Sequence, residues 1–445
     1  RHYRAGDLMN SVALTTLGCK VNQCESAFLE EKLSEAGFLL CSFAEKADLY
    51  CINTCAVTSR AAMQSRQLIR RAVRQNPKAR VVVMGCYPQI AAEEIATIPG
   101  ITHVLGTTEK LSLLDYLAPP EANAPPWIHL KDARKAPEPT PLVFSSFAHR
   151  TRAFLKIQDG CDAFCSYCVV PYARGRSRSI SLQSILAQVQ RFLDHNYQEI
   201  VLTGIHLGHW GLDLKPRQGL VDLLRAIFHQ SPPARFRLSS LEPGEITPEL
   251  LELVATTPEL CPHLHIPLQS GDSSVLSRMN RHYHPNLYRE LVLGAIHQMP
   301  DLAVGADVLV GFPGETDECF QNTYQLIESL PLAYLHIFPF SPRPTTPAAH
   351  MKEQVAPALI RQRCQSLREL DQKKRLTFLQ RFLGKIRPVL VENRRDQASG
   401  MHCGFSDNYL PVLVQANSGS ENRLLMARFD RLEETKLVAI PIQSK

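Results

Sequence analysis

Two stretches of the chain alternate apolar strand patterns with amphipathic helix patterns, and this alternation restricts the fold more than any other feature. The first stretch covers residues 11–118. Its expected strands and helices, in chain order, are Ser11–Leu17, Glu25–Gly37, Asp48–Ile52, Thr58–Arg74, Arg80–Met84 and Ile90–Ile98. Strands that alternate with helices pair in parallel, so the pattern predicts a doubly wound parallel α/β sheet.

The second stretch, residues 151–376, repeats this alternation. Its strand candidates are Ala153–Ile157, Glu199–Thr203, Arg235–Leu238, His263–Pro267, Ala303–Leu309 and Tyr334–Phe338. Helical patterns lie between most of them, which predicts a partial (β/α)6 barrel related to the (β/α)8 design. The active residues of such a barrel are expected at the carboxyl ends of its strands.

Residues 119–150 separate the two stretches with many prolines and are predicted to be a linker. A long helical segment is expected over residues 353–383, and short β patterns follow it. These β patterns are Ile386–Glu392, Tyr409–Val414, Arg423–Phe429 and Lys436–Ile442. They predict a small C-terminal all-β barrel over residues 380–443, of the OB-like type that suits RNA.

The 445 residues include thirteen cysteines, yet the composition is that of an ordinary globular protein. Hydrophobic residues make up 44% of the chain and charged residues 21%, so a large core can form without disulfides. No apolar run reaches the ~18 residues that a membrane span needs. We therefore expect a reducing cytoplasmic location without membrane contact, where cysteines can bind metal.

The formal net charge of +6 is mild, but the basic residues are clustered. One cluster lies in the first stretch and consists of Arg60, Arg66, Arg70, Arg71, Arg74, Lys78 and Arg80. Another surrounds residues 161–168 and consists of Arg150, Arg152, Lys156, Arg174, Arg176 and Arg178. Solvated helix faces carry similar charges, but clusters beside a metal site fit a nucleic-acid partner better.

The segment Cys161-Asp-Ala-Phe-Cys165-Ser-Tyr-Cys168 places three thiols within eight residues. Three thiolates can hold a [4Fe-4S] cluster by three of its irons and leave the fourth iron open to another ligand. Gly160 permits the tight turn that a loop around a cluster needs. Two other interpretations remain, which are three buried structural cysteines and a zinc site with a remote fourth ligand.

Cys19, Cys55 and Cys86 each lie two or three residues beyond the end of a predicted strand of the first stretch. Parallel strands end at one edge of a sheet, so these three thiols should meet and could hold a second [4Fe-4S] cluster with an open iron. The alternative is three buried apolar cysteines. Core or surface positions are expected for the other seven, namely Cys24, Cys41, Cys51, Cys261, Cys319, Cys364 and Cys403.

The C-x3-C-x2-C spacing with an aromatic residue before the third cysteine resembles the radical S-adenosylmethionine superfamily. In that superfamily the open iron binds the amino and carboxylate groups of S-adenosylmethionine, and an electron from the cluster breaks the S–C5′ bond. The resemblance implies that Tyr167 lies beside the adenine and that Gly204 meets the methionine end. It also implies S-adenosylmethionine contacts at Glu242 and Gln269.

Longer motifs resemble the methylthiotransferase family over nearly the whole chain. In the first stretch they are Thr16-Leu-Gly-Cys19-Lys-Val-Asn22-Gln, Asn53-Thr-Cys55-Ala-Val-Thr58 and Met84-Gly-Cys86. In the second they are Lys156-Ile-Gln-Asp-Gly-Cys161, Val170-Pro-Tyr-Ala-Arg174-Gly175, Leu202-Thr-Gly204-Ile-His206-Leu-Gly208, His265-Ile-Pro-Leu-Gln269-Ser-Gly271, Gly311-Phe-Pro-Gly314-Glu315-Thr and Phe338-Pro-Phe-Ser-Pro342-Arg343. By the same resemblance the C-terminal barrel is a TRAM domain, which is an RNA-binding module.

Within that family, the segments around Cys19 and His206 are most similar to the branch that modifies C2 of N6-threonylcarbamoyladenosine at position 37 of tRNA. Cys24 departs from that branch, which often has an aromatic residue there, so this segment offers two thiols. Rival substrates are isopentenyladenosine-37 of tRNA and an aspartate of a ribosomal protein. The alternative that is not an enzyme is a zinc-bearing RNA-binding protein.

The resemblance implies two [4Fe-4S] clusters and two molecules of S-adenosylmethionine. One molecule methylates a sulfur at the first-stretch cluster, and the other supplies the radical that activates C2. No side-chain acid or base can abstract that hydrogen, so no catalytic side chain is expected beyond the cluster ligands. The implied partners are the anticodon stem-loop of tRNA and an electron donor such as flavodoxin or ferredoxin. Candidate substrate contacts are His206, His209, Arg174 and Arg343.

Overall fold

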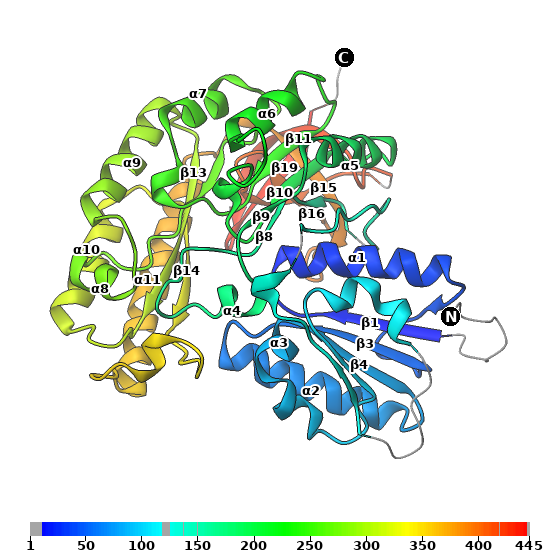
Figure 1. Ribbon diagram of the computed structural model, residues 1–445. Coiled ribbons are helices and arrows are strands. Elements are labelled where there is room, and N and C mark those ends of the chain that lie inside the picture. The colour runs from blue at the N-terminus through cyan, green and yellow to red at the C-terminus, as the bar shows by residue number, and fades with distance from the viewer. Residues whose placement is uncertain (1–10, 118–124, 137, 149, 418, 443–445) are drawn as a thin grey trace. The chain divides into compact units, whose positions relative to one another are not determined.

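The computed structural model describes residues 11–117, 125–136, 138–148, 150–417 and 419–442 (Figure 1). These residues form two compact units. The first unit contains the described residues of 11–145, 158–180 and 341–349, and the second contains those of 146–157, 181–340 and 350–442. Within these ranges, no helix is long and apolar enough to cross a membrane.

The first unit is built on a parallel sheet with the strand order β2-β1-β3-β4-β5-β6. Its strands are β1 (Ser11–Thr16), β2 (Leu39–Leu40), β3 (Leu49–Thr54), β4 (Arg80–Gly85), β5 (His103–Leu105) and β6 (Trp127–His129). Helix α1 (Lys20–Glu35) covers one face of the sheet, and α2 (Ser59–Gln75) and α3 (Cys86–Ala96) lie on the other (Figure 1). The predicted doubly wound α/β sheet is confirmed.

Helix α2 shows how the sequence produces this packing. Its buried side chains, Ala62, Ser65, Ile69 and Ala72, recur every three or four residues, so one stripe of the helix faces the sheet. The helix begins after Thr58, whose side chain accepts a hydrogen bond from a backbone N–H of the first turn at 3.1 Å. Most of its arginines lie on the opposite, exposed face.

Two helices begin earlier than predicted, and the expected linker contains structure. Helix α1 begins at Lys20 rather than Glu25, and α3 begins at Cys86 rather than Ile90. Within the range predicted as a linker, 119–150, the described part includes strand β6, which pairs in parallel with β5. Three-residue strands are too short to show a period of two, and the surrounding prolines suggested only a loop. Residues 119–124 of that prediction lie outside the described residues, as does residue 443 of the predicted C-terminal barrel.

The segment with Cys161, Cys165 and Cys168 belongs to the first unit, although the sequence predicted one continuous core over residues 151–376. Strand β8 (Gln158–Asp159) pairs antiparallel with β9 (Arg178–Ser179) and closes the base of this segment. The short helix α4 (Val170–Arg174) lies between them. The boundary differs from the prediction because hydrogen bonds distant in sequence, described below, tie this segment to α1.

The second unit holds a series of parallel strands. They are β7 (Ala153–Lys156), β10 (Glu199–Thr203), β11 (Arg235–Leu238), β12 (His263–His265), β13 (Ala303–Val310) and β14 (Tyr334–Pro339). The sheets β11-β10-β7 and β12-β13-β14 are joined by the single parallel bridges Phe236–Leu260 and Ser240–His265. This order follows the chain, as a partial (β/α)6 barrel requires, and confirms that prediction.

Helices form the outer layer of this barrel (Figure 1). They are α5 (Leu182–Asp194), α6 (Leu220–Phe228), α7 (Pro248–Thr256), α8 (Ser273–Arg278), α9 (Pro285–Gln298) and α10 (Asp317–Ser329). The long helix α11 (Pro357–Gln380) follows β14 in the chain and packs against it and α10. It confirms the helix expected over residues 353–383.

The C-terminal strands close into a barrel in the order β15-β16-β17-β19-β18. They are β15 (Ile386–Arg395), β16 (His402–Ser406), β17 (Pro411–Val414), β18 (Leu424–Glu433) and β19 (Lys436–Pro441). Val389, Val412 and Phe429 are among the fully buried apolar side chains that fill it. The predicted small all-β barrel is confirmed, with β16 as a strand that the sequence pattern had not indicated.

A buried ion cluster joins the C-terminal barrel to the parallel strands of the same unit. Glu199 of β10 is fully buried and accepts hydrogen bonds from Arg235 Nε at 2.6 Å and Arg237 Nε at 2.9 Å, while Arg152 Nη1 lies 3.9 Å away. The two β11 arginines also donate to backbone carbonyls of Pro388, Phe405, Ser406 and Asp407. Burial alone would raise the pKa of Glu199, but the arginines hold it well below its usual range.

Replacing this carboxylate should destabilise the second unit strongly. Glu199→Gln leaves three arginine charges without their shared anion, which should cost about 3–5 kcal/mol of unfolding free energy. Urea unfolding of the full chain measures the loss. The matched control is Glu249→Gln, which breaks an ion pair with Arg225. Both side chains of that pair are more than half exposed, so this substitution should cost less than about 1 kcal/mol. Equal losses in the two variants would contradict the assigned role of Glu199.

Candidate functional site

Cys19, Cys55 and Cys86 lie where three neighbouring parallel strands end. They follow β1, β3 and β4, which are adjacent in the sheet. The last residues of β3 and β4, Thr54 and Gly85, are paired in register, so Cys55 and Cys86 leave the sheet side by side. Cys19 is the residue before the first turn of α1, and Cys86 opens α3.

The contacts around these strand ends bring the three thiols together. A Cβ atom added to Gly18 would lie 3.0 Å from Sγ of Cys55, so only glycine allows the loop before Cys19 to come this close. Burial, helped by the nearby thiols of Cys86 and Cys19, raises the pKa of Cys55 to about 11. Cys19, Cys55 and Cys86, which the strand ends grouped, therefore lie close enough for Cys19 and Cys86 to affect the pKa of Cys55.

Cys24 and Cys51, the competing cysteines of this region, are fully buried in α1 and β3. The remaining five lie outside the strand-end group, with Cys261, Cys319, Cys364 and Cys403 buried and Cys41 partly buried. Core positions are the better description of these side chains.

Cys161, Cys165 and Cys168 occupy a tight loop between β8 and α4. Gly160 has φ +75°, and a Cβ atom there would lie 1.8 Å from the carbonyl oxygen of Arg176. The N–H of Cys161 donates to the carbonyl of Gly175 at 3.0 Å, and the N–H of Cys168 donates to the carbonyl of Cys165 at 2.9 Å. The loop is therefore folded back on itself by its own backbone, with Cys165 buried and the other two thiols partly exposed.

A buried polar network links this loop to the strand ends of the first unit. Arg174, only 1% exposed, donates from Nη1 to Glu25 Oε1 at 3.0 Å and to Asp159 Oδ1 at 2.9 Å. Its Nη2 atom donates to Glu25 Oε2 and to Asn22 Oδ1. Lys110 Nζ lies 2.6 Å from Glu25 Oε2, and both side chains are fully buried. One glutamate of α1 thus holds two cations from distant parts of the chain.

The same network reaches the cysteine-bearing strand ends. Asn22 donates from Nδ2 to the carbonyls of Leu17 and Thr54, which lie beside Cys19 and Cys55. Burial raises the pKa of the Cys86 thiol, whereas the positive charges of Arg174 and Lys110 oppose that rise. A cation pair beside three thiols favours their anionic form, which is the form that binds iron.

These contacts correct the prediction that Arg174 is a substrate contact or part of a phosphate-binding cluster. Its guanidinium is buried and donates hydrogen bonds to side chains of the first unit. Lys156 is only 4% exposed, so it too is unsuited to bind a phosphate at the surface. Arg150 and Arg176 are exposed, as a contact to a polyanion requires.

Arg343 is also buried, at 8% exposure, and lies near Tyr87, Glu94 and Cys55 of the first unit. Burial lowers its pKa, while those acidic groups partly offset the effect. Its Nε atom donates no hydrogen bond to any residue that the structure describes. Arg343 therefore keeps donor capacity beside the strand-end cysteines.

The residues predicted to contact S-adenosylmethionine lie in both units. Gly204, Glu242 and Gln269 follow β10, β11 and β12, so they lie at the carboxyl edge of the second unit's strands. Glu242 is ion-paired with Arg281, although burial raises its pKa. Gln269 adopts φ +62° and donates its N–H to the carbonyl of Asp307 at 2.8 Å. Tyr167 belongs to the cysteine loop of the first unit and is partly exposed.

Sequence reasoning did not identify Glu25, Lys110 and Asp159 as parts of the site. These residues could have been noticed because they are charged at positions that the helix or strand pattern expects to be buried. Glu25, for example, lies among the buried residues of α1. Charged residues are almost never fully buried unless they are paired. The partners could not be named, because Arg174 lies 149 residues from Glu25.

Family comparisons agree with this organisation. The family described as "Uncharacterized protein family UPF0004" matches residues 11–106, and the Radical SAM superfamily matches residues 155–327. Among solved structures, the radical S-adenosylmethionine methyltransferase TsrM from Kitasatospora setae superposes with a TM-score of 0.58 over 76% of this chain and 75% of TsrM. Their sequence identity is 15%, so this likeness concerns the fold alone.

Curated relatives match over most of the chain. Threonylcarbamoyladenosine tRNA methylthiotransferase MtaB of Bacillus subtilis is 37% identical over 94% of this chain and 94% of its own length. The MtaB protein of Aquifex aeolicus is 38% identical over 86% of this chain and 93% of its own. A tRNA-2-methylthio-N(6)-dimethylallyladenosine synthase of Pelotomaculum thermopropionicum is 30% identical over 89% and 90%, respectively. This chain belongs to the radical S-adenosylmethionine methylthiotransferase family.

Proposed function

We propose that this protein adds a methylthio group to C2 of N6-threonylcarbamoyladenosine at position 37 of tRNA. The observation that carries the proposal is the meeting of Cys19, Cys55 and Cys86 at one sheet edge, in the same unit as the C-x3-C-x2-C loop. Two separate sets of three thiols suit two clusters that each keep an open iron. A methylthio transfer needs both a radical source and a site that holds sulfur.

The radical SAM membership implies one [4Fe-4S] cluster and S-adenosylmethionine, which together supply radical chemistry that side chains cannot. Cys161, Cys165 and Cys168 are the proposed ligands of this cluster. Cys19, Cys55 and Cys86 are the proposed ligands of the second one. Gly18 and Gly160, where a Cβ atom would collide with Cys55 and with the carbonyl oxygen of Arg176, permit the tight loops that a cluster needs around it.

Gly204, Glu242 and Gln269 are the proposed S-adenosylmethionine contacts in the second unit, and Tyr167 is the proposed contact in the first. The first three suit this role because ligands of (β/α) barrels bind at the carboxyl ends of the strands. Glu242 offers a carboxylate to a ribose hydroxyl or an amino group. Arg281 holds that carboxylate in place.

Several surfaces support tRNA as the substrate. The exposed face of α2 carries Arg60, Arg70, Arg71 and Arg74, which suit contacts to phosphates. In the second unit, a cavity of about 720 Å³ between the parallel strands and the C-terminal barrel is lined by residues that include Arg150, His195 and Arg423. We assign RNA binding to that barrel, as in a TRAM domain, and the electron supply to a donor of the flavodoxin or ferredoxin class.

The relatives favour the threonylcarbamoyl substrate over the dimethylallyl one. Five relatives named for threonylcarbamoyladenosine share 33–38% identity with this chain, whereas those named for dimethylallyladenosine share 30–31%. The threonylcarbamoyl group carries a carboxylate, and the buried guanidinium of Arg343 has donor capacity for an anion. Arg343 is therefore the residue that we assign to this carboxylate.

Nucleoside analysis of tRNA tests the substrate directly. Deleting the gene should remove 2-methylthio-N6-threonylcarbamoyladenosine from tRNA hydrolysates, and the unmethylthiolated nucleoside should accumulate. Complementation with the wild-type gene should restore the product. Loss of 2-methylthio-N6-dimethylallyladenosine instead would show that the substrate assignment is wrong, and unchanged nucleosides would reject tRNA altogether.

The cysteine assignment predicts the iron content of the anaerobically reconstituted protein. Wild type should hold about eight irons per chain, and Cys86→Ala or Cys161→Ala should each hold about four, because each removes one cluster. Iron and sulfide analysis measures this. Cys41→Ala, a partly buried cysteine of the same unit, should keep the full content. A colourless protein that holds zinc but no sulfide would support the non-enzymatic rival instead.

The buried network makes a separate prediction for the first unit. Arg174→Gln removes the cation that Glu25 and Asp159 share and leaves Glu25 with Lys110 and Asp159 with Arg178, which lies 3.9 Å away, so unfolding should become easier by about 3–5 kcal/mol. We also expect the loop cluster to be lost faster to a chelator, although all six cysteines remain. Arg176→Gln, an exposed arginine two residues away, is the control and should behave as wild type. Equal chelator resistance in both variants would show that the network does not position the loop.

A further inference from the structure

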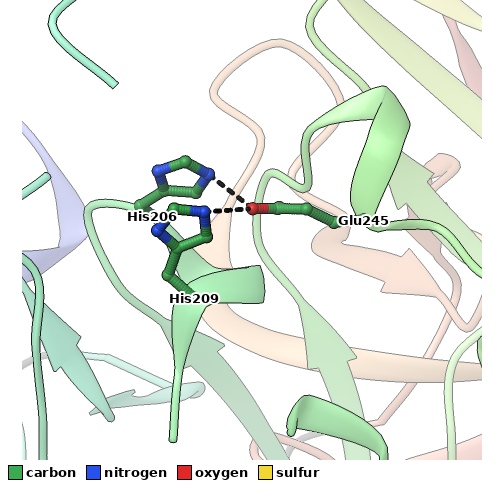
Figure 2. A group of neighbouring side chains, drawn as sticks. All are labelled: His206, His209 and Glu245. Carbon is green, nitrogen blue, oxygen red and sulfur yellow. Dashed lines mark ion pairs between the residues drawn. The ribbon is translucent and has the colours of Figure 1, made fainter. Parts of the chain in front are cut away.

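Two histidines and a glutamate converge at the carboxyl edge of the second unit's strands. His206 follows β10, His209 ends the turn η3 (Leu207–His209), and Glu245 ends the turn η4 (Pro243–Glu245) after β11. His206 Nε2 lies 2.5 Å and His209 Nε2 lies 3.6 Å from the same atom, Oε1 of Glu245. Figure 2 shows both rings reaching toward this carboxylate from one side. One ligand atom from each residue lies within 4.8 Å of the other two.

The surrounding backbone holds the glutamate in this position. The other carboxylate oxygen of Glu245, Oε2, accepts a hydrogen bond from the N–H of Glu242 at 2.9 Å. A Cβ atom added to Gly208 would lie 2.3 Å from Oε2, so only glycine between the two histidines leaves room for the carboxylate. Glu245 is thus fixed through Oε2, and Oε1 is left to face the imidazoles.

The two rings are stacked, with centroids 3.6 Å apart and planes 15° from parallel. Two protonated imidazoles this close would repel each other, so at most one can carry a charge at little cost. A neutral imidazole that turns an acceptor nitrogen to a carboxylate oxygen is also unfavourable. Oε1 of Glu245 is buried and accepts no well-formed hydrogen bond from any residue in the described ranges. A cation bound by this oxygen and the two nearby imidazole nitrogens would give Oε1 a partner.

The second unit contains another group of two histidines and a carboxylate, His265, His336 and Asp307, whose carboxylate oxygen does have hydrogen-bond partners. His265 Nε2 lies 2.8 Å and His336 Nδ1 lies 3.2 Å from Asp307 Oδ1, both in hydrogen-bonding geometry. The other ring nitrogen of His265 is hydrogen-bonded to the hydroxyl of Tyr334 at 3.1 Å. These ordinary hydrogen bonds account for that group without a metal.

We propose that His206, His209 and Glu245 bind a divalent transition-metal ion through two imidazole nitrogens and one carboxylate oxygen. This set of donors is typical of Zn²⁺ and Fe²⁺ sites in which three protein ligands leave a position for water or for a substrate oxygen. His209 is about one-third exposed, so an exogenous ligand can reach that position. The site uses none of the six cysteines, and it does not rest on the proposed methylthiotransferase activity.

Zinc binding by the cluster-loaded full chain tests the proposal, because filled clusters occupy the six cysteines that we propose as cluster ligands. After anaerobic dialysis against Zn²⁺, wild type should hold about one more zinc per chain than His206→Gln, His209→Gln or Glu245→Gln. Iron and sulfide contents, measured on the same samples, should not differ among them. His297→Gln, which alters an exposed histidine of α9, should retain the wild-type zinc content and corrects for loose surface binding.

Two variants of His209 give the clearest test. This side chain is partly exposed, so replacing it is less able to unfold the chain than replacing a buried residue. His209→Asp keeps a metal-binding oxygen and should bind zinc more tightly than His209→Gln. Zinc also stabilises only a chain that binds it, so the unfolding temperature should rise with zinc in wild type and not in His209→Gln. Equal zinc contents in wild type and His209→Gln, with iron unchanged, overturn the proposal.

Discussion

The pairing of Glu25 with two buried cations is the interaction on which the first unit depends. Glu25 and Asp159 supply two negative charges, Arg174 and Lys110 supply two positive ones, and Arg178 lies 3.9 Å from Asp159, so each buried carboxylate has two cations beside it. Moving such charges out of water costs several kcal/mol per ion, and only close partners recover that cost. The partners come from α1, from the turn η1 (Glu109–Tyr116) and from the segment between β8 and α4, inclusive, that contains the cysteine loop. These three segments therefore cannot separate without exposing or isolating a charge.

This constraint explains how the cysteines keep their positions without disulfides between them. The three strand ends are set by the parallel register, and Gly85, at φ +104°, turns the chain from β4 into α3. A Cβ atom at Gly85 would lie 2.6 Å from Asn53 Oδ1, which accepts a hydrogen bond from Lys110 at 3.2 Å. The turn that places Cys86 is thus in contact with the ion network, and backbone geometry and charge pairing fix the same edge.

The sequence predicted the elements of this site more completely than the contacts between them. Cys19, Cys55 and Cys86 could be grouped because strand patterns end just before each of them and parallel strands end together. Arg174 was misassigned, because a run of arginines looks the same whether its members face solvent or a buried glutamate. Strand β6 was missed because three residues among prolines show no periodicity. Pairings across more than a hundred residues leave no local signal, and these are the contacts that place the cysteine loop in the first unit.

In the second unit, the buried Glu199 and the partly buried Glu245 have different partners, and the difference follows the direction of the strands. Glu199 lies at the amino end of β10, where three arginines neutralise it and its role is to hold the C-terminal barrel. Glu245 follows the carboxyl end of β11, where imidazoles rather than permanent cations face it. Arginine remains charged at all ordinary pH values and satisfies a carboxylate permanently, whereas neutral histidine nitrogens keep a lone pair for a metal. In this barrel the amino end is therefore built for stability, and the carboxyl end retains the capacity to bind ligands.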